Sequence, residues 1–137
     1  MVNQVFTYFE EQAGPNAADD KELLKLWKRN WHSKGWIPTV LGISDAMEHP
    51  HAPVYQRLIE NLPTVNCKAY EQACWRRWLA YERVLIKGPN NYALFTDVDV
   101  LNLSLTPHSV FPRSSCGVWL HKDMTPCVVA DWDLVKR

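Results

Sequence analysis

Two aspartates, Asp97 and Asp99, are the residues whose type and spacing most clearly predict chemistry in this sequence. They follow an apolar run over residues 92–96, so one turn of the backbone would aim both carboxylates at a single ligand. Two hard oxygen donors suit Mg²⁺ or Mn²⁺, which keep several waters and bind phosphate oxygens at the same time. The pair therefore predicts a divalent metal site for a phosphorylated ligand, and the alternative is a solvated turn.

The strands that would position this pair can be predicted from composition. Residues 92–96 form a continuous apolar run, which is typical of a parallel strand buried on both faces. Ligands of open α/β sheets bind beyond the carboxyl ends of such strands, where Asp97 follows. Residues 2–9 are rich in β-branched and aromatic side chains and predict a first strand. Residues 36–41 predict another, which Pro38 places at a strand start or at a sheet edge.

The helices are predicted from apolar spacing. Residues 21–34 place Leu23, Leu24, Trp27 and Trp31 on one face, after a cap at Asp19 or Asp20. A short helical piece capped by Ser44 or Asp45 and a short helix over residues 54–61 come next. Residues 68–85 predict a longer helix, whose expected buried face consists of Tyr70, Ala73, Cys74, Trp78, Tyr81 and Leu85.

Residues 101–112 are expected to be irregular, and residues 117–120 and 127–130 predict two further short strands. Strands therefore alternate with helices along most of the chain. This order predicts one α/β domain over residues 1–137, with a Rossmann-like, mostly parallel layered sheet flanked by helices.

Composition limits the class of protein and its partners. A chain of 137 residues that is 47% hydrophobic suits one domain with a substantial core. Lys plus Arg equals Asp plus Glu at 15 each, so no overall field attracts nucleic acid. Residues 1–8 lack a basic region and a long apolar run, and no later stretch approaches a membrane span. We therefore expect a cytoplasmic protein without a nucleic-acid partner or a membrane span.

Cysteine, histidine and tryptophan give weaker signals. The spacing of Cys67, Cys74, Cys116 and Cys127 fits neither a CxxC metal motif nor a dense disulfide framework, so reduced thiols are expected, with Cys74 buried on a helix. His49 and His51 lack partners for a tetrahedral metal site, and His108 and His121 are read as structural. Trp27, Trp31 and Trp78 are assigned to the core, whereas Trp36, Trp119 and Trp132 are harder to place.

Together, the strand at residues 5–9, the helix that carries Arg77, and the strand that leads into Asp97 and Asp99 resemble a known family. They are similar to the donor-binding half of DxD-containing glycosyltransferases of the GT-A fold, over roughly residues 2–105. In that family the second aspartate coordinates the metal that clamps the diphosphate of a nucleotide sugar, and the first contacts the ribose or a metal-bound water. By position, the resemblance gives these roles to Asp99 and Asp97.

The same resemblance implies three further contacts. An arginine often stands on the helix before the DxD strand, which corresponds to Arg77, with Arg76 as the competing choice. Such a guanidinium would brace the acidic pair or bind a phosphate with its planar set of donors. The end of the first strand lies beside the nucleotide, so Tyr8 and Glu10 are expected to contact the base and ribose. Many members have a Gly-Gly pair before the DxD strand, whereas this chain has a longer loop at residues 87–91.

The resemblance implies a domain that binds a nucleotide-diphosphate sugar through Mn²⁺ or Mg²⁺ and transfers the sugar to an unknown acceptor. Full catalytic domains of the family continue further than residues 100–137, so a non-catalytic, shortened domain that binds nucleotide or a protein partner is an alternative. An exposed sheet edge in such a domain would favour a homo-oligomer.

A second alternative is a haloacid-dehalogenase-like phosphatase, whose first motif residues 95–101 also resemble. Asp97 would then be the phosphoryl-accepting nucleophile and Asp99 the general acid. That family places the motif near the start of its domain, whereas residues 1–96 precede it here. We therefore rank this interpretation below the glycosyltransferase-like one.

Overall fold

The structure, a computed structural model, describes residues 3–12, 14–87, 92–110, 119–120 and 127–131. Its five strands form one sheet in the order β2-β1-β3-β5-β4. Three of them are parallel neighbours: β1 (Gln4–Tyr8), β2 (Ile37–Leu41) and β3 (Tyr92–Thr96). Two are antiparallel additions: β5 (Cys127–Asp131) pairs with β3, and β4 (Trp119–Leu120) pairs with β5. The parallel arrangement expected for most of the sheet is thus found in β1, β2 and β3, and the two strands at the other side of the sheet are antiparallel.

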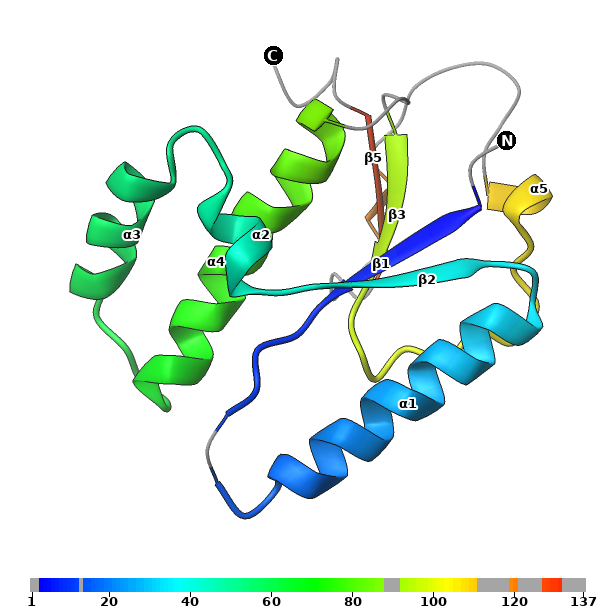
Figure 1. Cartoon of the computed structure of the whole chain (residues 1–137), viewed down its shortest axis with the longest axis horizontal. Helices are drawn as coiled ribbons and strands as arrows, with labels where there is room; N and C mark the ends of the chain where they lie inside the picture. The colour runs from blue at the N-terminus through cyan, green and yellow to red at the C-terminus, as the bar shows by residue number, and fades with distance from the viewer. Residues whose placement is uncertain (1–2, 13, 88–91, 111–118, 121–126, 132–137) are drawn as a thin grey trace.

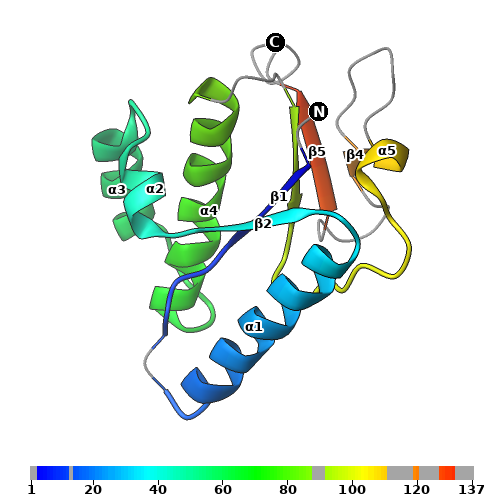
Figure 2. The same ribbon diagram turned by 45° about the vertical axis from the view of Figure 1, so that its right-hand side comes forward.

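Helices cover both faces of the parallel strands. One helix, α1 (Ala17–Ser33), connects β1 to β2. Three helices connect β2 to β3: α2 (Ile43–Met47), α3 (Ala52–Asn61) and α4 (Lys68–Lys87). Figures 1 and 2 show α1 on one side of the sheet and α4 on the other, with α2 and α3 beside α4. The chain is a mixed α/β structure with a three-stranded parallel open sheet flanked by helices.

The core lies in two clusters because successive residues of a strand face opposite sides of the sheet. Phe6 and Phe95 belong to the cluster on the α4 side. Its other buried members are Leu41, Ala46, Ile59, Leu79, Ala80, Tyr81, Leu85 and Ala93. Val5 and Leu94 belong to the cluster on the α1 side, together with Trp27, Trp31 and Trp36. Trp36, which the sequence pattern did not place, is thus fully part of the core.

Several predicted boundaries and caps need correction. α1 begins at Ala17, and its N-cap is Asn16 rather than Asp19 or Asp20. The two aspartates lie in the first turn instead, where the helix dipole favours negative charge. The N-cap of α2 is Gly42, whose N–H donates to the Asp45 carboxylate at 2.9 Å. A short helix, α5 (Pro107–Val110), occupies part of the segment that was expected to be irregular.

The position of β2 at the edge of the sheet agrees with the expectation from its internal proline. Pro38 is the second residue of β2, and β2 has β1 as its neighbour in the sheet order. An edge strand tolerates proline because one side of its backbone makes no ladder hydrogen bonds.

The predicted buried face of α4 is partly wrong. The buried residues are Arg76, Leu79, Ala80, Tyr81 and Leu85. Trp78, which was expected in the core, is 41% exposed. Cys74 is partly exposed and, like Tyr70 and Ala73, lines a cavity. The buried face is therefore rotated from the expected stripe, and Arg76 lies on it, bonded to the Glu10 carboxylate that follows β1.

Cys67 and Cys74 are free thiols, Cys116 lies outside the described residues, and Cys127 is the first residue of β5. Trp132 and His121 also lie outside the described residues. None of the helices in the described part of the chain has the length and apolar character needed to cross a membrane.

Candidate functional site

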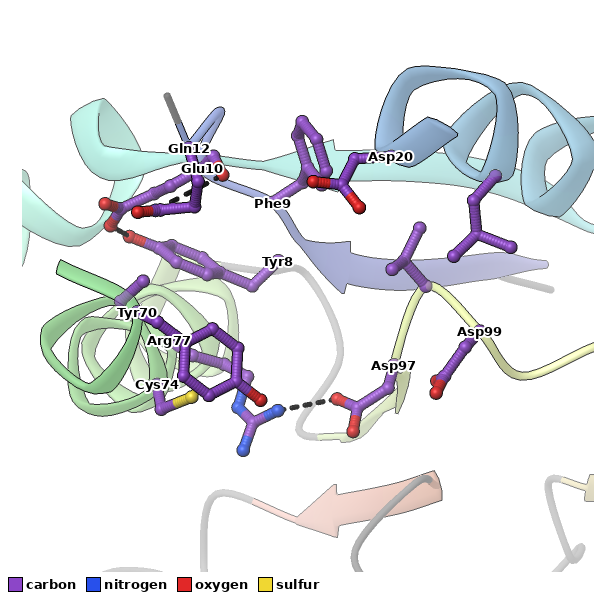
Figure 3. A pocket seen from close by; sticks show the side chains of 13 residues that line it. Tyr8, Phe9, Glu10, Gln12, Asp20, Tyr70, Cys74, Arg77, Asp97 and Asp99 are labelled. Atoms are coloured by element: carbon purple, nitrogen blue, oxygen red, sulfur yellow. Dashed lines mark hydrogen bonds and ion pairs between the residues drawn. The ribbon is translucent and has the colours of Figure 1, made fainter. Parts of the chain in front are cut away.

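The candidate site lies where the connections on either side of β1 diverge. From β1 the chain passes along α1 to β2 on one side, and it returns through α4 to β3 on the other side of β1. In open α/β sheets this arrangement leaves a crevice beyond the carboxyl ends of the two strands, where ligands bind. A cavity of about 260 Å³ lies there, and residues at the end of β1 and in the turn after β3 line it (Figure 3).

The five residues that the aspartate pair and the family resemblance assigned to the site all line this cavity, whereas Arg76, the competing choice, does not. The five residues are Tyr8, Glu10, Arg77, Asp97 and Asp99. The other lining residues are Phe9, Gln12, Asp20, Leu23, Tyr70, Ala73, Cys74 and Val98. The first two turns of α1, the end of β1, one face of α4 and the turn after β3 therefore form its walls.

Asp97 and Asp99 stand in a tight turn directly after β3. The Val100 N–H donates to the Asp97 carbonyl at 3.1 Å, which closes the turn. Val98 and Val100 pack against the tryptophan cluster on the α1 side. Figure 3 shows the Asp97 carboxylate between Arg77 and Asp99. The backbone turn that the carboxylates need to face a common ligand is thus present.

Two buried indoles of α1 hold this turn on either side. The Trp27 Nε1–H donates to the Thr96 hydroxyl at 3.0 Å, one residue before Asp97. The Trp31 Nε1–H donates to the Val100 carbonyl at 3.0 Å, one residue after Asp99. Both indoles are fully buried, so water does not compete for these bonds.

The segment after the turn is hydrogen-bonded to Asn30 of α1 and to Trp36, which follows α1. The Trp36 Nε1–H donates to the Leu105 carbonyl at 3.0 Å. The Asn30 side chain accepts from the Asn102 N–H at 2.6 Å and donates to the Asn102 carbonyl at 3.2 Å. Sequence reasoning missed these positioning residues. The available signal was the pairing of large amphiphilic side chains at helical spacing in α1, since buried tryptophans need an acceptor for their N–H.

Arg77 pairs with the first aspartate of the turn. Its Nη1 donates to the Asp97 carboxylate at 2.6 Å, and its guanidinium carbon lies 5.4 Å from the centre of the Trp78 ring. Four residues along α4, Tyr81 stacks on Phe95 with ring centres 4.2 Å apart. Because residues i and i+4 share a helix face and residues i and i+2 share a strand face, this stack positions the ion pair.

The two carboxylates of the turn differ in environment. Burial raises the pKa of Asp97, the nearby charge of Asp99 raises it further, and Arg77 opposes both effects, so the net pKa is raised. Asp99 is exposed, and neither it nor Asp20 on the opposite wall forms an ion pair with a described residue. The cavity therefore carries two uncompensated negative charges.

Glu10 is engaged within the protein. Arg76 Nε and Nη2 donate to its two carboxylate oxygens at 2.7 and 2.6 Å, and the Tyr8 hydroxyl donates to one of the same oxygens. Burial acts to raise the pKa of Glu10, but the bonds from Arg76 and Tyr8 and the charge of Arg76 lower it overall. A contact between Glu10 and a ribose would have to share an oxygen that already accepts a bond.

None of the histidines in the described part of the chain lines this cavity. The His49 Nδ1 accepts from the His51 N–H at 3.1 Å, and Nε2 is 2.9 Å from the Glu82 carboxylate. A ring nitrogen that accepts a backbone N–H carries no proton, so the other nitrogen donates to Glu82. His108 is an exposed residue of α5.

The donor set of the cavity fits only certain metal ions. Among the described residues, no group of three or more His, Cys, Asp or Glu side chains could hold a metal ion. The turn offers two carboxylates, one already paired with Arg77. This set fits an ion such as Mg²⁺ or Mn²⁺, which is commonly held by one or two carboxylates, water and the phosphate oxygens of a ligand.

Comparison with known proteins places the chain in a family. The family model described as Domain of unknown function (DUF8765) matches residues 2–95. The matched part includes Tyr8, Glu10 and Arg77 and ends before Asp97. Searches of the curated proteins and of the solved structures found no significant match. The chain therefore belongs to the DUF8765 family.

Proposed function

We propose that this member of the DUF8765 family binds a nucleotide diphosphate, and the corresponding nucleotide sugar, through Mn²⁺ or Mg²⁺ in the cavity beyond β1 and β3. The observation that carries the proposal is the convergence of Tyr8 and Glu10 at the end of β1 with Asp97 and Asp99 after β3, around Arg77 from α4. This is the position at which open α/β sheets bind nucleotides.

The charges of the cavity support a metal-bound ligand. Asp20 and Asp99 have no ion-pair partner among the described residues, so a diphosphate without a cation would be repelled. Asp99 is the exposed carboxylate of the turn and is the main metal ligand in this proposal. Asp97 is the second. The ion would supply positive charge at the diphosphate, which is the leaving group when a sugar is transferred.

The remaining walls suit the other parts of a nucleotide. Arg77 offers a planar set of donors of the kind that binds phosphate, and Tyr8, Phe9, Leu23 and Tyr70 offer aromatic and apolar surface for a base and ribose. Ligand sites typically combine such apolar walls with a few converging polar groups. Nucleotide specificity would then depend on contacts near the end of β1.

The finer fold assignment is part of the same proposal. We infer that the three parallel strands, with α1 on one face and α4 on the other, are a Rossmann-like arrangement of the GT-A type. The strand order β2-β1-β3 supports this because it corresponds to the part of a doubly wound sheet that surrounds the nucleotide. The reaction implied is transfer of a glycosyl group to an acceptor.

Isothermal titration calorimetry with Mn²⁺ and either UDP or GDP tests the proposal. We expect Mn²⁺ to bind weakly alone and more tightly with at least one of these nucleotides. Asp99→Asn should weaken the metal-dependent binding at least about tenfold, or ~1.4 kcal/mol, because it removes the main carboxylate ligand. Asp19→Asn is the matched control, since Asp19 is exposed on α1 and does not line the cavity.

Two results would contradict the proposal. The first is an Mn²⁺ affinity that is the same with and without both nucleotide diphosphates. The second is an Asp99→Asn variant that binds Mn²⁺ and nucleotide as tightly as the Asp19→Asn control. Either result would leave the two aspartates as a solvated turn.

A further inference from the structure

Adjacent arginines of α4 are held in very different ways. Arg76 makes a two-pronged contact with Glu10, through bonds of 2.7 and 2.6 Å, and the two side chains are only 7% and 10% exposed. Arg77 makes one bond of 2.6 Å to one oxygen of Asp97, whose side chain is 39% exposed. The first pair is locked, whereas the second is open to solvent and to competing ligands.

Arg77 also has donors to spare. A guanidinium carries five N–H groups, and Asp97 takes one of them. Its Nε is buried without a hydrogen-bond partner among the described residues. The indole of Trp78 lies against the guanidinium, which keeps it at the cavity wall independently of Asp97. Arg77 could therefore exchange Asp97 for another anion without leaving its place.

With the pair closed, each half of a metal-diphosphate ligand meets an obstacle. A diphosphate without a metal finds the positive charge of Arg77 already balanced by Asp97 and faces the carboxylates of Asp20 and Asp99, which have no ion-pair partner among the described residues. A metal ion alone finds Asp97 already neutralised, so Asp99 is the free carboxylate of the turn. A diphosphate that carries its metal satisfies both partners at once, because phosphate oxygens can replace Asp97 at Arg77 while the ion takes the Asp97 carboxylate.

We propose that the Arg77–Asp97 ion pair is the specificity element of the site and makes the binding of metal and diphosphate mutually dependent. This inference rests on the proposed function and explains how the cavity would reject free nucleotide and free metal. By linkage, a metal that frees Arg77 strengthens diphosphate binding by the same factor by which the diphosphate strengthens metal binding.

Substitutions that open the pair from either side should have opposite effects. Asp97→Asn frees Arg77, so metal-free pyrophosphate should bind at least about threefold more tightly than to the wild type, while the enhancement by Mn²⁺ falls. Arg77→Gln frees Asp97, so Mn²⁺ alone should bind at least about threefold more tightly, while pyrophosphate binding is lost. Calorimetry with pyrophosphate in EDTA, with Mn²⁺ alone, and with Mn²⁺ plus UDP measures all three affinities.

Two control variants separate this effect from a simple change in net charge. Asp19→Asn and Arg29→Gln change exposed residues of α1 that do not line the cavity. If Asp97→Asn and Arg77→Gln move the affinities no further than these controls, the exchange is wrong, even where the wild type binds Mn²⁺ with UDP. If the wild type shows no metal-dependent binding of UDP, GDP or pyrophosphate, the proposed function itself fails and the inference falls with it.

Discussion

The contrast between Arg76 and Arg77 gives a prediction about stability that requires no ligand. The perturbation is the same in both cases, Arg76→Gln or Arg77→Gln, at neighbouring positions of one helix. Arg76→Gln leaves the Glu10 carboxylate buried, with Tyr8 as its remaining side-chain donor. Arg77→Gln leaves Asp97 unpaired at a site that water reaches. The two substitutions should therefore differ greatly in cost.

The magnitudes follow from burial. Breaking a buried ion pair by removing one partner costs about 3–5 kcal/mol, because the remaining charge stays desolvated. An exposed or half-exposed pair is worth less than about 1 kcal/mol. For a chain of this size, 1 kcal/mol corresponds to a change in melting temperature of roughly 3–5 °C. We expect Arg76→Gln to lower the melting temperature by more than about 10 °C and Arg77→Gln by only a few degrees.

Urea unfolding followed by tryptophan fluorescence is the appropriate assay. The buried indoles of Trp27 and Trp31 in α1, and of Trp36 just before β2, report on the core. The slope against urea concentration should be unchanged, so that the midpoint reports stability. The double variant Glu10→Gln with Arg76→Gln should recover about 1–2 kcal/mol relative to the sum of the single changes. If the free energies of unfolding of Arg76→Gln and Arg77→Gln differ by less than about 1 kcal/mol, the assignment of Arg76 to a buried, stabilising ion pair is refuted.

The pH dependence of a Glu10 variant and the substitution of two buried tryptophans provide two further tests. The pKa of Glu10 is lowered in the folded chain, so its contribution is fully present above the ordinary value of 4.5 and is lost as the pH falls through the lowered pKa. The fall in unfolding free energy below pH 4.5 should therefore be shallower in Glu10→Gln than in the wild type, and equal slopes would contradict this. Trp31→Phe removes the N–H that holds Val100 and should cost about 1–3 kcal/mol and weaken Mn²⁺–UDP binding. Trp36→Phe removes the N–H that donates to the Leu105 carbonyl, and it should destabilise the fold to a similar degree without weakening Mn²⁺–UDP binding. Equal losses of binding in the two variants would show that the effect is not local to the turn.

The parts of the fold that sequence reasoning predicted are those with a local signal. β3 has buried apolar residues on both faces, with Ala93 and Phe95 on one and Leu94 on the other, so its burial and the position of Asp97 could be anticipated from the apolar run. Pro38 marked β2 as an edge strand for the equally local reason that proline lacks an N–H. The antiparallel pairing of β5 with β3 had no such signal, because strand direction depends on the path of the intervening chain.

The tryptophans show where local patterns fail. Trp27 and Trp31 fall on the predicted apolar face of α1, so their burial could be foreseen. Their acceptors could not, because Thr96 and Val100 lie far along the chain and the sequence does not show that α1 packs against this strand end and turn. Trp78 was assigned to the core by helical spacing, yet it is partly exposed and lies against Arg77. Aromatic residues occur on several sides of α4, so periodicity alone does not identify its buried face.

The choice between Arg76 and Arg77 illustrates the limit most clearly. A sequence pattern does not distinguish two neighbouring arginines. Successive helix residues point about 100° apart, however, so the two side chains reach different strand ends. The one that faces the chain beyond β1 meets Glu10, and the one that faces the chain beyond β3 meets Asp97. Which is which depends on the rotation of α4 about its axis, and the same packed face of α4 carries Tyr81, whose ring stacks on Phe95 of β3. The difference between a structural arginine and a ligand-accessible one therefore arises from how α4 packs on the sheet, which the residue types at these two positions do not reveal.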